Sequence, residues 1–221
     1  MKTAMTNIKH HLTDALLMAY SAGTLPEAFN LTVAAHLSMC DDCRARQGAF
    51  DTVGGAMLEN CERVRMDQGS LEATMARIRA APVIPTQRAS TPKLASGLPT
   101  PLFDYIGGDL DTVKWRPVGM GVKQAILPTS RDATARLLFI PAGAAVPDHG
   151  HRGTELTLVL RGAFQDETDH FGPGDIEVAN EDLHHTPVAD IGEDCICLAA
   201  TDAPLRFSGL IPRIAQPFLR I

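Results

Sequence analysis

The stretch GAAVPDHGHRGTELTLVLRG, residues Gly143 to Gly162, carries the most specific pattern in this chain of 221 residues. Residues i and i+2 of a β-strand point to the same face, so His149 and His151 are expected to aim at one point. Glu155 can share that face, unless a turn at Arg152-Gly153 resets the alternation. Histidine nitrogens and a carboxylate oxygen suit zinc, iron, manganese or nickel. The stretch therefore predicts a metal site carried by short strands.

The same stretch resembles the first motif of the cupins, in which a glycine, His-x-His, a glutamate and a second glycine follow at fixed spacing. All five positions of that motif are filled here, by Gly143, His149, His151, Glu155 and Gly162. The resemblance implies a jelly-roll barrel. It also implies that His149, His151 and Glu155 are metal ligands.

A second stretch, FGPGDIEVANEDLHHTP, resembles the second cupin motif, with a Pro-Gly-Asp turn and a histidine eleven residues after the glycine. Counting from Gly174, that histidine is His185. Its neighbour His184 would point to the opposite face of a strand, so we expect His185 to be the fourth ligand. The asparagine that usually follows this histidine is absent here.

Short runs typical of β-strands, separated by glycine, proline and aspartate, continue through the second part of the chain. They predict an all-β cupin domain over residues 102–221. Cys195 and Cys197 alternate in DCICLAA and are expected to face one side of a strand as buried thiols. A reactive thiol near the metal is the alternative interpretation.

The first eighty residues have helical periodicity instead. Apolar residues recur at helical spacing over residues 12–23, 26–40 and 70–81. A further helix is expected from about Asp42 to Glu59, interrupted or frayed near Gly54-Gly55. The pattern predicts an all-α domain over residues 1–80. Residues 81–101 hold five of the fifteen prolines and are expected to form a linker.

Three potential metal ligands lie in HLSMCDDC, at the end of the second predicted helix and the start of the third. His36 and Cys40 are four residues apart and Cys43 follows three later, so all three are expected along one helical stripe. Tetrahedral zinc needs a fourth ligand, and His10 or His11 could supply it. A thioredoxin-like redox pair is disfavoured, because the helical context lacks a βαβ unit. The other alternative is that these are ordinary buried residues.

Residues 6–80 resemble the zinc-binding anti-sigma domain, described by a histidine, a long gap and then His-x3-Cys-x2-Cys. The residues after His11 align better with that family than those after His10, so the resemblance favours His11 and leaves His10 as the spare. It implies a zinc site, and a helical module that holds an extracytoplasmic-function sigma factor one-to-one away from RNA polymerase core. The implied ligands are His11, His36, Cys40 and Cys43.

Together the two halves resemble zinc anti-sigma factors of the ChrR type, and the resemblance spans nearly the whole chain. It implies one zinc ion in each domain, although the cupin site could accept another divalent transition metal. It further implies that the N-terminal domain suffices to hold the sigma factor and that the cupin domain is needed to release it under singlet oxygen or related oxidants. We hypothesise that the cupin metal shell, or a side chain near it, is oxidised or loses a ligand.

The alternative function is a cupin metalloenzyme, of dioxygenase or isomerase type, joined to a zinc-dependent protein-interaction module. The helical half argues against a free-standing enzyme because it implies a protein partner. We assign no catalytic residues.

Composition limits the remaining possibilities. The net charge is -6 and no run of Lys or Arg stands out, which disfavours direct nucleic-acid binding. No apolar run approaches the ~18 residues that a membrane helix needs, and the N-terminus lacks the pattern of a signal peptide. We expect a cytoplasmic protein whose five cysteines are reduced.

Overall fold

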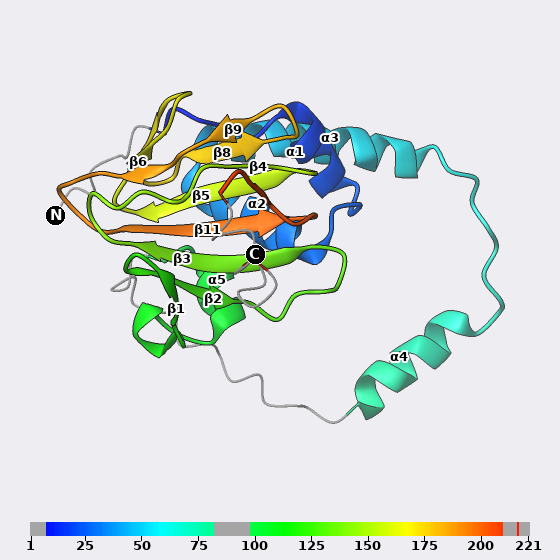
Figure 1. Cartoon of the computed structure of the whole chain (residues 1–221). Coiled ribbons are helices and arrows are strands. Elements are labelled where there is room, and N and C mark those ends of the chain that lie inside the picture. Colours follow the sequence, from blue (N-terminus) through cyan, green and yellow to red (C-terminus); the bar gives the residue numbers. More distant parts are fainter. Residues whose placement is uncertain (1–7, 82–97, 210–215, 217–221) are drawn as a thin grey trace, which may run out of the picture.

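The computed structural model describes residues 8–81, 98–209 and 216, and it confirms the predicted fold class, with helices preceding a β-rich barrel (Figure 1). The helices are α1 Asp14–Ser21, α2 Glu27–Met39, α3 Asp41–Glu59, α4 Ser70–Ala80, α5 Thr100–Ile106 and the 3-10 helix η1 Leu110–Thr112. The strands are β1 Arg116–Gly119, β2 Val122–Ile126, β3 Thr134–Ile140, β4 His149–Gly150, β5 Glu155–Arg161, β6 Phe164–Gln165, β7 His170–Phe171, β8 Ile176–Ala179, β9 His184–His185, β10 Val188–Ala189, β11 Cys195–Thr201 and β12 Arg206–Phe207.

The barrel is built from antiparallel strands in one large and two small sheets. The large sheet has six strands in the order β1-β2-β3-β11-β5-β8. Two three-stranded sheets, β10-β6-β7 and β12-β4-β9, complete the barrel. Because β4 and β9 are neighbours, the two histidine motifs meet in one small sheet although they are far apart in the sequence.

The central strand β11 is buried at all seven positions, so both faces of the large sheet are covered. Cys195 and Cys197 belong to the apolar cluster inside the barrel. Ile196 and Leu198 belong to a second cluster on the outer face. The prediction that the two cysteines share one side is confirmed, and their sulfur atoms lie 3.5 Å apart.

Helix α2 supplies the cover on the outer face. It contacts β11, β5 and β3, and in Figure 1 it lies behind these strands. Phe29, Val33 and Leu37 of α2 join the sheet residues in one continuous apolar core. At the start of α2, the carboxylate of Glu27 accepts a hydrogen bond from the backbone N–H of Ser130, 2.6 Å away. Helix α2 is therefore packed directly against the barrel, and α1 and α3 contact α2 and each other.

Two local expectations are wrong. Helix α3 continues through Gly54-Gly55 without interruption, because helical hydrogen bonding tolerates glycine at a modest cost. The chain after the proline-rich stretch first forms α5 and η1, and the first strand starts only at Arg116. Leu98 and Leu102 are buried against α2, which explains why a helix forms there. Residues 82–97 of the predicted linker lie outside the described residues, and the domain boundary stays a prediction.

The helices that the structure describes include none with the length and apolarity needed to cross a membrane.

Candidate metal centres

The first candidate centre lies where α2 ends and α3 begins. Cys40 has an extended backbone, with φ −112° and ψ 109°, and separates the two helices. Its sulfur accepts a hydrogen bond from the backbone N–H of Cys43 at 3.4 Å and so caps α3. This agrees with the predicted end of one helix at Cys40 and start of the next at about Asp42. The helical stripe through His36, Cys40 and Cys43 is interrupted at Cys40, since an N-cap residue is not helical. The break directs both sulfur atoms toward the segment that precedes α1.

Four potential ligands converge there, each with one donor atom within 4.8 Å of the others: His11, His36, Cys40 and Cys43. His11 Nδ1 lies 3.3 Å from the Cys40 sulfur and 3.6 Å from the Cys43 sulfur. Two thiols and two imidazoles form a donor set that zinc commonly takes in closed structural sites.

The ring of His36 shows the clearest fit to a metal. Its Nδ1 donates a hydrogen bond to the backbone carbonyl of Gly174 at 3.0 Å, which leaves Nε2 with a free lone pair. That Nε2 atom is buried and has no hydrogen-bond partner among the described residues. A buried nitrogen without a partner is costly, and a metal ion would satisfy it while the Gly174 carbonyl fixes the ring.

The structure shows which of His10 and His11 joins the cluster, a choice that the sequence pattern alone left open. The ring of His10 packs on Phe171, with 4.3 Å between ring centroids, and its Nε2 lies 3.1 Å from a carboxylate oxygen of Asp169. His10 thus faces the barrel, whereas His11 faces the two thiols. Adjacent residues of an extended segment point in opposite directions, so only one of them can join the cluster.

Burial controls protonation in this cluster. It lowers the pKa of His36 to about 4, so the imidazole is neutral and able to bind a metal at physiological pH. Burial also raises the pKa of Cys43 to about 11, so this thiol keeps its proton until a cation favours the thiolate. Metal binding at this cluster is therefore expected to release protons.

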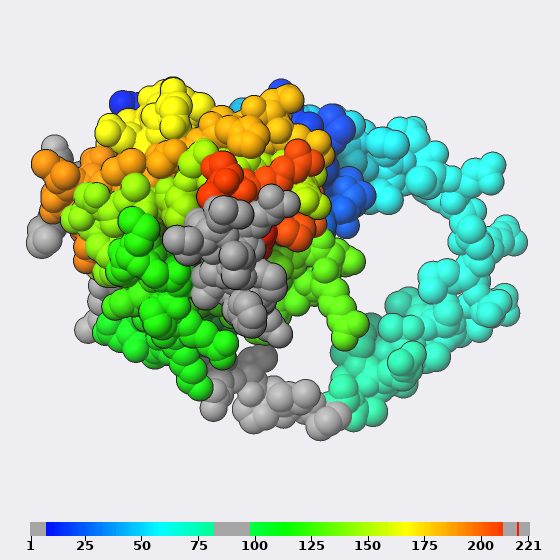
Figure 2. Space-filling model, viewed as in Figure 1, coloured from blue at the N-terminus to red at the C-terminus, as the bar shows by residue number. Residues whose placement is uncertain are grey.

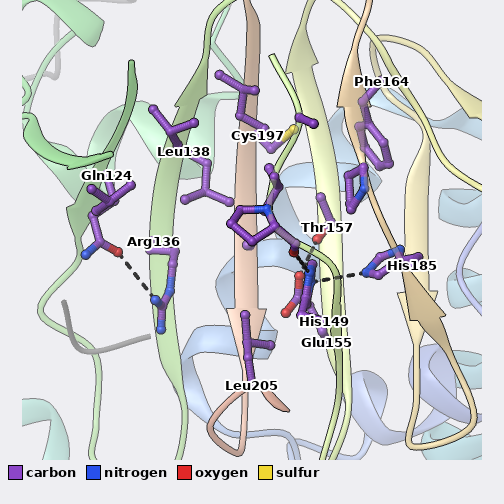
Figure 3. Close-up of a pocket in the computed structure, with 18 of the residues that line it drawn as sticks. Gln124, Arg136, Leu138, His149, Glu155, Thr157, Phe164, His185, Cys197 and Leu205 are labelled. Atoms are coloured by element: carbon purple, nitrogen blue, oxygen red, sulfur yellow. Dashed lines mark hydrogen bonds between the residues drawn. The ribbon is translucent and has the colours of Figure 1, made fainter. Parts of the chain in front are cut away.

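The second candidate centre lies inside the barrel, where His149, His151 and His185 converge. The Nε2 atom of His185 lies 3.2 Å from Nε2 of His149 (Figure 3). It also lies 3.2 Å from Nε2 of His151. Zinc–nitrogen bonds of about 2.0–2.1 Å place two ligand atoms about 3.0–3.4 Å apart, so these spacings suit a shared ion. His149 is oriented by its Nδ1, which donates to the Pro147 carbonyl at 2.9 Å.

The strand register explains which histidine of the pair His184-His185 enters the centre. His149 pairs with His185 across β4 and β9, and His185 is buried while His184 is exposed. This matches the alternation argument made from the sequence.

Glu155 lies at the border of the histidine cluster. Its Oε2 is 3.6 Å from Nδ1 of His151, and its Oε1 accepts a hydrogen bond from the Thr157 hydroxyl at 3.0 Å. The tight group of potential ligands contains the three histidines without Glu155. The predicted glutamate thus stands within reach of the cluster, where Thr157 holds its carboxylate.

Two functional carboxylates were missed by the sequence analysis. Asp166 and Glu177 flank Nδ1 of His185, with oxygens at 2.8 and 3.2 Å. Burial opposes a charge on His185, yet these carboxylates raise its pKa to about 9. Burial raises the pKa of Glu177 to about 7. The carboxylates therefore stabilise positive charge at His185, whether a proton or a metal ion carries it.

A sequence signal for Glu177 existed in the strand DIEVAN. Glu177 is the one charged residue within an otherwise apolar strand, and it is buried. Buried carboxylates are rare unless they have a partner. No comparable signal marked Asp166, because its closeness to His185 depends on how the loop after β6 folds.

The Pro-Gly-Asp turn that precedes β8 joins the first centre to the barrel. Gly174 accepts the hydrogen bond from His36, and the carboxylate of Asp175 accepts backbone hydrogen bonds from Lys9 at 2.6 Å and His10 at 2.9 Å. Two residues further along the strand, Glu177 contacts His185 of the second centre. The turn thus contacts the first candidate centre, and the strand β8 that follows it contacts the second through Glu177.

Comparison with known proteins identifies relatives of the whole chain. Residues 105–204 match the family model described as the ChrR cupin-like domain. The anti-sigma-E factor ChrR of Cereibacter sphaeroides is 59% identical over 219 residues, which cover 97% of this chain and 99% of that protein.

A solved structure agrees with this relationship. The crystal structure of Rhodobacter sphaeroides SigE in complex with the anti-sigma ChrR matches with a TM-score of 0.78 and 58% identity. The match covers 89% of this chain and 100% of that one. The chain therefore belongs to the ChrR family of anti-sigma factors, which are transcriptional regulators rather than metabolic enzymes.

Proposed function

We propose that this protein binds an extracytoplasmic-function sigma factor in a one-to-one complex and keeps it from RNA polymerase core in the cytoplasm. The observation that carries the proposal is an unpartnered apolar segment, residues 53–78, which we call the apolar arm. It comprises the end of α3, the connection after it and most of α4. The family relationship points to a sigma factor as the partner.

The apolar arm exposes large side chains that a stable monomer would normally cover. Leu58 is 76% exposed and Ile78 is 62% exposed, and α4 has no buried residue at all. Figure 2 shows the arm in cyan and blue-green, projecting from one side of the molecule with open space between much of it and the barrel. The exposed large apolar residues of the arm are Val53, Met57, Leu58, Val64, Met66, Leu71, Met75 and Ile78.

Helix α4 has the pattern of a helix that packs against a partner. Leu71, Met75 and Ile78 recur at spacings of four and three residues, so they form one apolar face. An isolated helix of this length is marginal in water, because helices shorter than about 12–15 residues need tertiary contacts. Contacts with a sigma factor would bury this face and stabilise the helix.

Inhibition then follows from competition. A sigma surface covered by the arm is not free to dock on RNA polymerase, so the two complexes exclude each other. Release requires a second state of the regulator with lower affinity for the sigma factor. A signal shifts the equilibrium between the two states only by the difference in its interaction free energy with them.

We further propose that zinc occupies both centres. His11, His36, Cys40 and Cys43 would hold a structural ion that ties the segment before α1 to the junction of α2 and α3. His149, His151 and His185, with Glu155 at the border, would hold the second ion. The three barrel histidines also suit other divalent transition metals. A bound ion would supply positive charge and fixed ligand directions at each centre.

The release step is proposed to depend on the barrel centre and to respond to singlet oxygen or related oxidants. The turn at Gly174-Asp175 and the strand β8 after it offer a physical route, because the turn contacts the first centre and Glu177 of β8 contacts His185 of the second. A change in the position of β8 would alter the acceptor of His36 and the anchor of residues 9–10. This route is a hypothesis about coupling, and it requires two arrangements of the turn with different sigma affinities.

The sigma-binding surface is tested on α4. Replacing Leu71 or Met75 with aspartate is expected to weaken sigma binding at least about 30-fold, because central apolar anchors of an interface often contribute 2 kcal/mol or more. Titration of labelled sigma factor with purified protein measures the dissociation constant.

The matched control is Ala73→Asp, which adds the same charge to the opposite face of α4. It should bind sigma factor normally. Equal affinity for Met75→Asp and wild type would show that the α4 face is not the contact surface, provided that circular dichroism and zinc content are unchanged.

A further inference from the structure

The interior of the barrel contains a cavity of about 260 Å³ beside the histidine cluster (Figure 3). This volume is slightly below the ~300–1,000 Å³ usual for pockets that hold drug-sized ligands, so it suits a small molecule. Most of its wall is apolar. The apolar side chains that line it include Val118, Val122, Leu138, Ile140, Val146, Phe164, Leu205 and Phe207.

A buried arginine stands in this apolar wall. Arg136 points inward from β3 and is only 6% exposed. Its Nη1 donates to Oε1 of Gln124 at 3.3 Å, whereas its buried Nε has no hydrogen-bond partner among the described residues. Burial lowers the pKa of Arg136, and the charge on Glu155 offsets this only in part. An arginine at this depth normally has a carboxylate partner, because an unpaired buried charge is costly.

The strand register leaves a space beside the guanidinium. Arg136 of β3 pairs with Ala199 of β11, and Ala199 pairs in turn with Thr157 of β5. Neighbouring strands are about 4.8 Å apart, so Arg136 and Thr157 are separated by about 10 Å across the sheet. The sheet residue between them, Ala199, contributes only a methyl group. Figure 3 shows Arg136 with Gln124 on one side of the cavity, and His149, Glu155 and His185 on the other.

We infer that the barrel binds an aliphatic monocarboxylate, with its carboxylate over Ala199 against Arg136 and its chain along the apolar wall. The Nε–H of Arg136, which has no hydrogen-bond partner in the described part of the chain, and a neighbouring Nη–H form the fork that matches a carboxylate with two parallel hydrogen bonds. The chain would contact Leu138, Ile140 and Phe164, which line the same cavity. This binding activity goes beyond the sigma-binding function.

The charges in the cavity favour a single negative charge on the ligand. Glu155 and Glu177 line its other end beside His185, so the guanidinium is the cation at the Arg136 end, and a second negative charge on a phosphate would gain no second cation there while meeting the field of the two carboxylates. A neutral alcohol would leave the arginine unpaired. Arg136 also borders a surface hollow lined by Arg131, Arg152 and Asp202, so the carboxylate would sit at this end of the cavity and the chain inside.

Isothermal titration of the purified, zinc-loaded full-length protein with octanoate, acetate and octan-1-ol tests the inference. Octanoate is expected to bind in a saturable manner, at least about 100-fold tighter than acetate, because each buried CH₂ contributes about 0.8 kcal/mol. Octan-1-ol and the Arg136→Gln variant are each expected to lose about 10- to 100-fold in affinity, the usual effect of losing hydrogen bonds to a charged group. The assay contains no sigma factor, so its result is independent of the proposed function.

Two further variants make the test specific. Arg161→Gln is the matched control, since it removes an exposed arginine of the same sheet and should leave octanoate binding unchanged. Ala199→Val keeps Arg136 but fills the space for the carboxylate, and it should abolish octanoate binding without unfolding the barrel. Absence of saturable octanoate binding to the wild type, or equal octanoate affinity in Arg136→Gln, would overturn the inference.

Discussion

Replacing both Cys40 and Cys43 with serine is expected to remove one equivalent of zinc and to abolish sigma binding. A structural zinc ion contributes an apparent ~10–16 kcal/mol to folding of a small zinc domain, as much as the whole ~5–15 kcal/mol stability of a typical domain. The loss should act on the segment around His11 and on the start of α3, which the cluster ties together. Helix α2 should stay on the sheet, because Phe29, Val33 and Leu37 still pack in the apolar core that it shares with the barrel.

Elemental analysis of the purified variant gives the zinc content, and hydrogen exchange locates the loosened residues. The matched control is Cys61→Ser, which removes an exposed thiol in the apolar arm and should retain zinc and sigma binding. Intact sigma binding after stoichiometric removal of zinc from the first centre would contradict a structural role for the metal.

Replacing Glu155 and His185 with alanine is expected to block oxidant-dependent release while inhibition of the sigma factor persists. The His185 substitution removes one of the three converging Nε2 atoms and leaves Asp166 and Glu177 without their cationic partner. Loss of supporting groups alone often costs 10- to 100-fold in metal affinity, roughly, and loss of a ligand costs more. The apolar arm is distant in structure from these residues, so sigma binding in the dark should be unchanged.

Release is measured as dissociation of a labelled sigma factor during illumination with a photosensitiser, alongside the metal content of the barrel. The control His184→Ala removes the neighbouring, exposed histidine and should release sigma factor like the wild type. If the Glu155 and His185 variants release at the wild-type rate, the barrel centre is not required for the response.

The barrel centre was largely predictable because its main ligands obey short-range rules. Alternation in a strand places His149 and His151 on one side and distinguishes His185 from His184, independently of the rest of the fold. Glu177 and Asp166 were missed because their position beside His185 depends on strand pairing and loop folding between distant segments. No short-range sequence pattern indicates which of these distant segments pair.

The first centre was predictable in its donor set and less so in its geometry. The spacing in HLSMCDDC identified three residues of the cluster, and the helix bounds placed Cys40 between two helices, yet the sequence did not reveal that the Cys40 sulfur caps α3. The assignment of His11 depended on resemblance, because His10 and His11 lie in an extended segment without a periodic pattern. What separates them physically is the Pro-Gly-Asp turn of the barrel, which holds the backbone of residues 9–10 and orients the chain.

The packing of α2 on the sheet had a weak sequence signal. The runs LTLVL in β5 and CICLAA in β11 are apolar at consecutive positions, as expected of strands buried on both faces. The proline-rich stretch at residues 81–101 predicted a linker between the helical domain and the barrel, and this prediction says nothing of the packing of α2 on the sheet. A linker composition indicates a flexible connection, and it does not prevent the two domains that it joins from packing against each other.

The carbonyl of Gly174 has a consequence for recombination between members of this family. His36 of the helical region donates its hydrogen bond to a carbonyl of the barrel, so the residues on both sides of this contact must remain compatible with each other. A chimaera that joins this helical region to another barrel is expected to orient the His36 ring as the parent does only if the new turn presents a carbonyl at the same place. Crossovers at the proline-rich stretch that ignore the contact should yield proteins with an impaired first centre, even when each half comes from a functional parent.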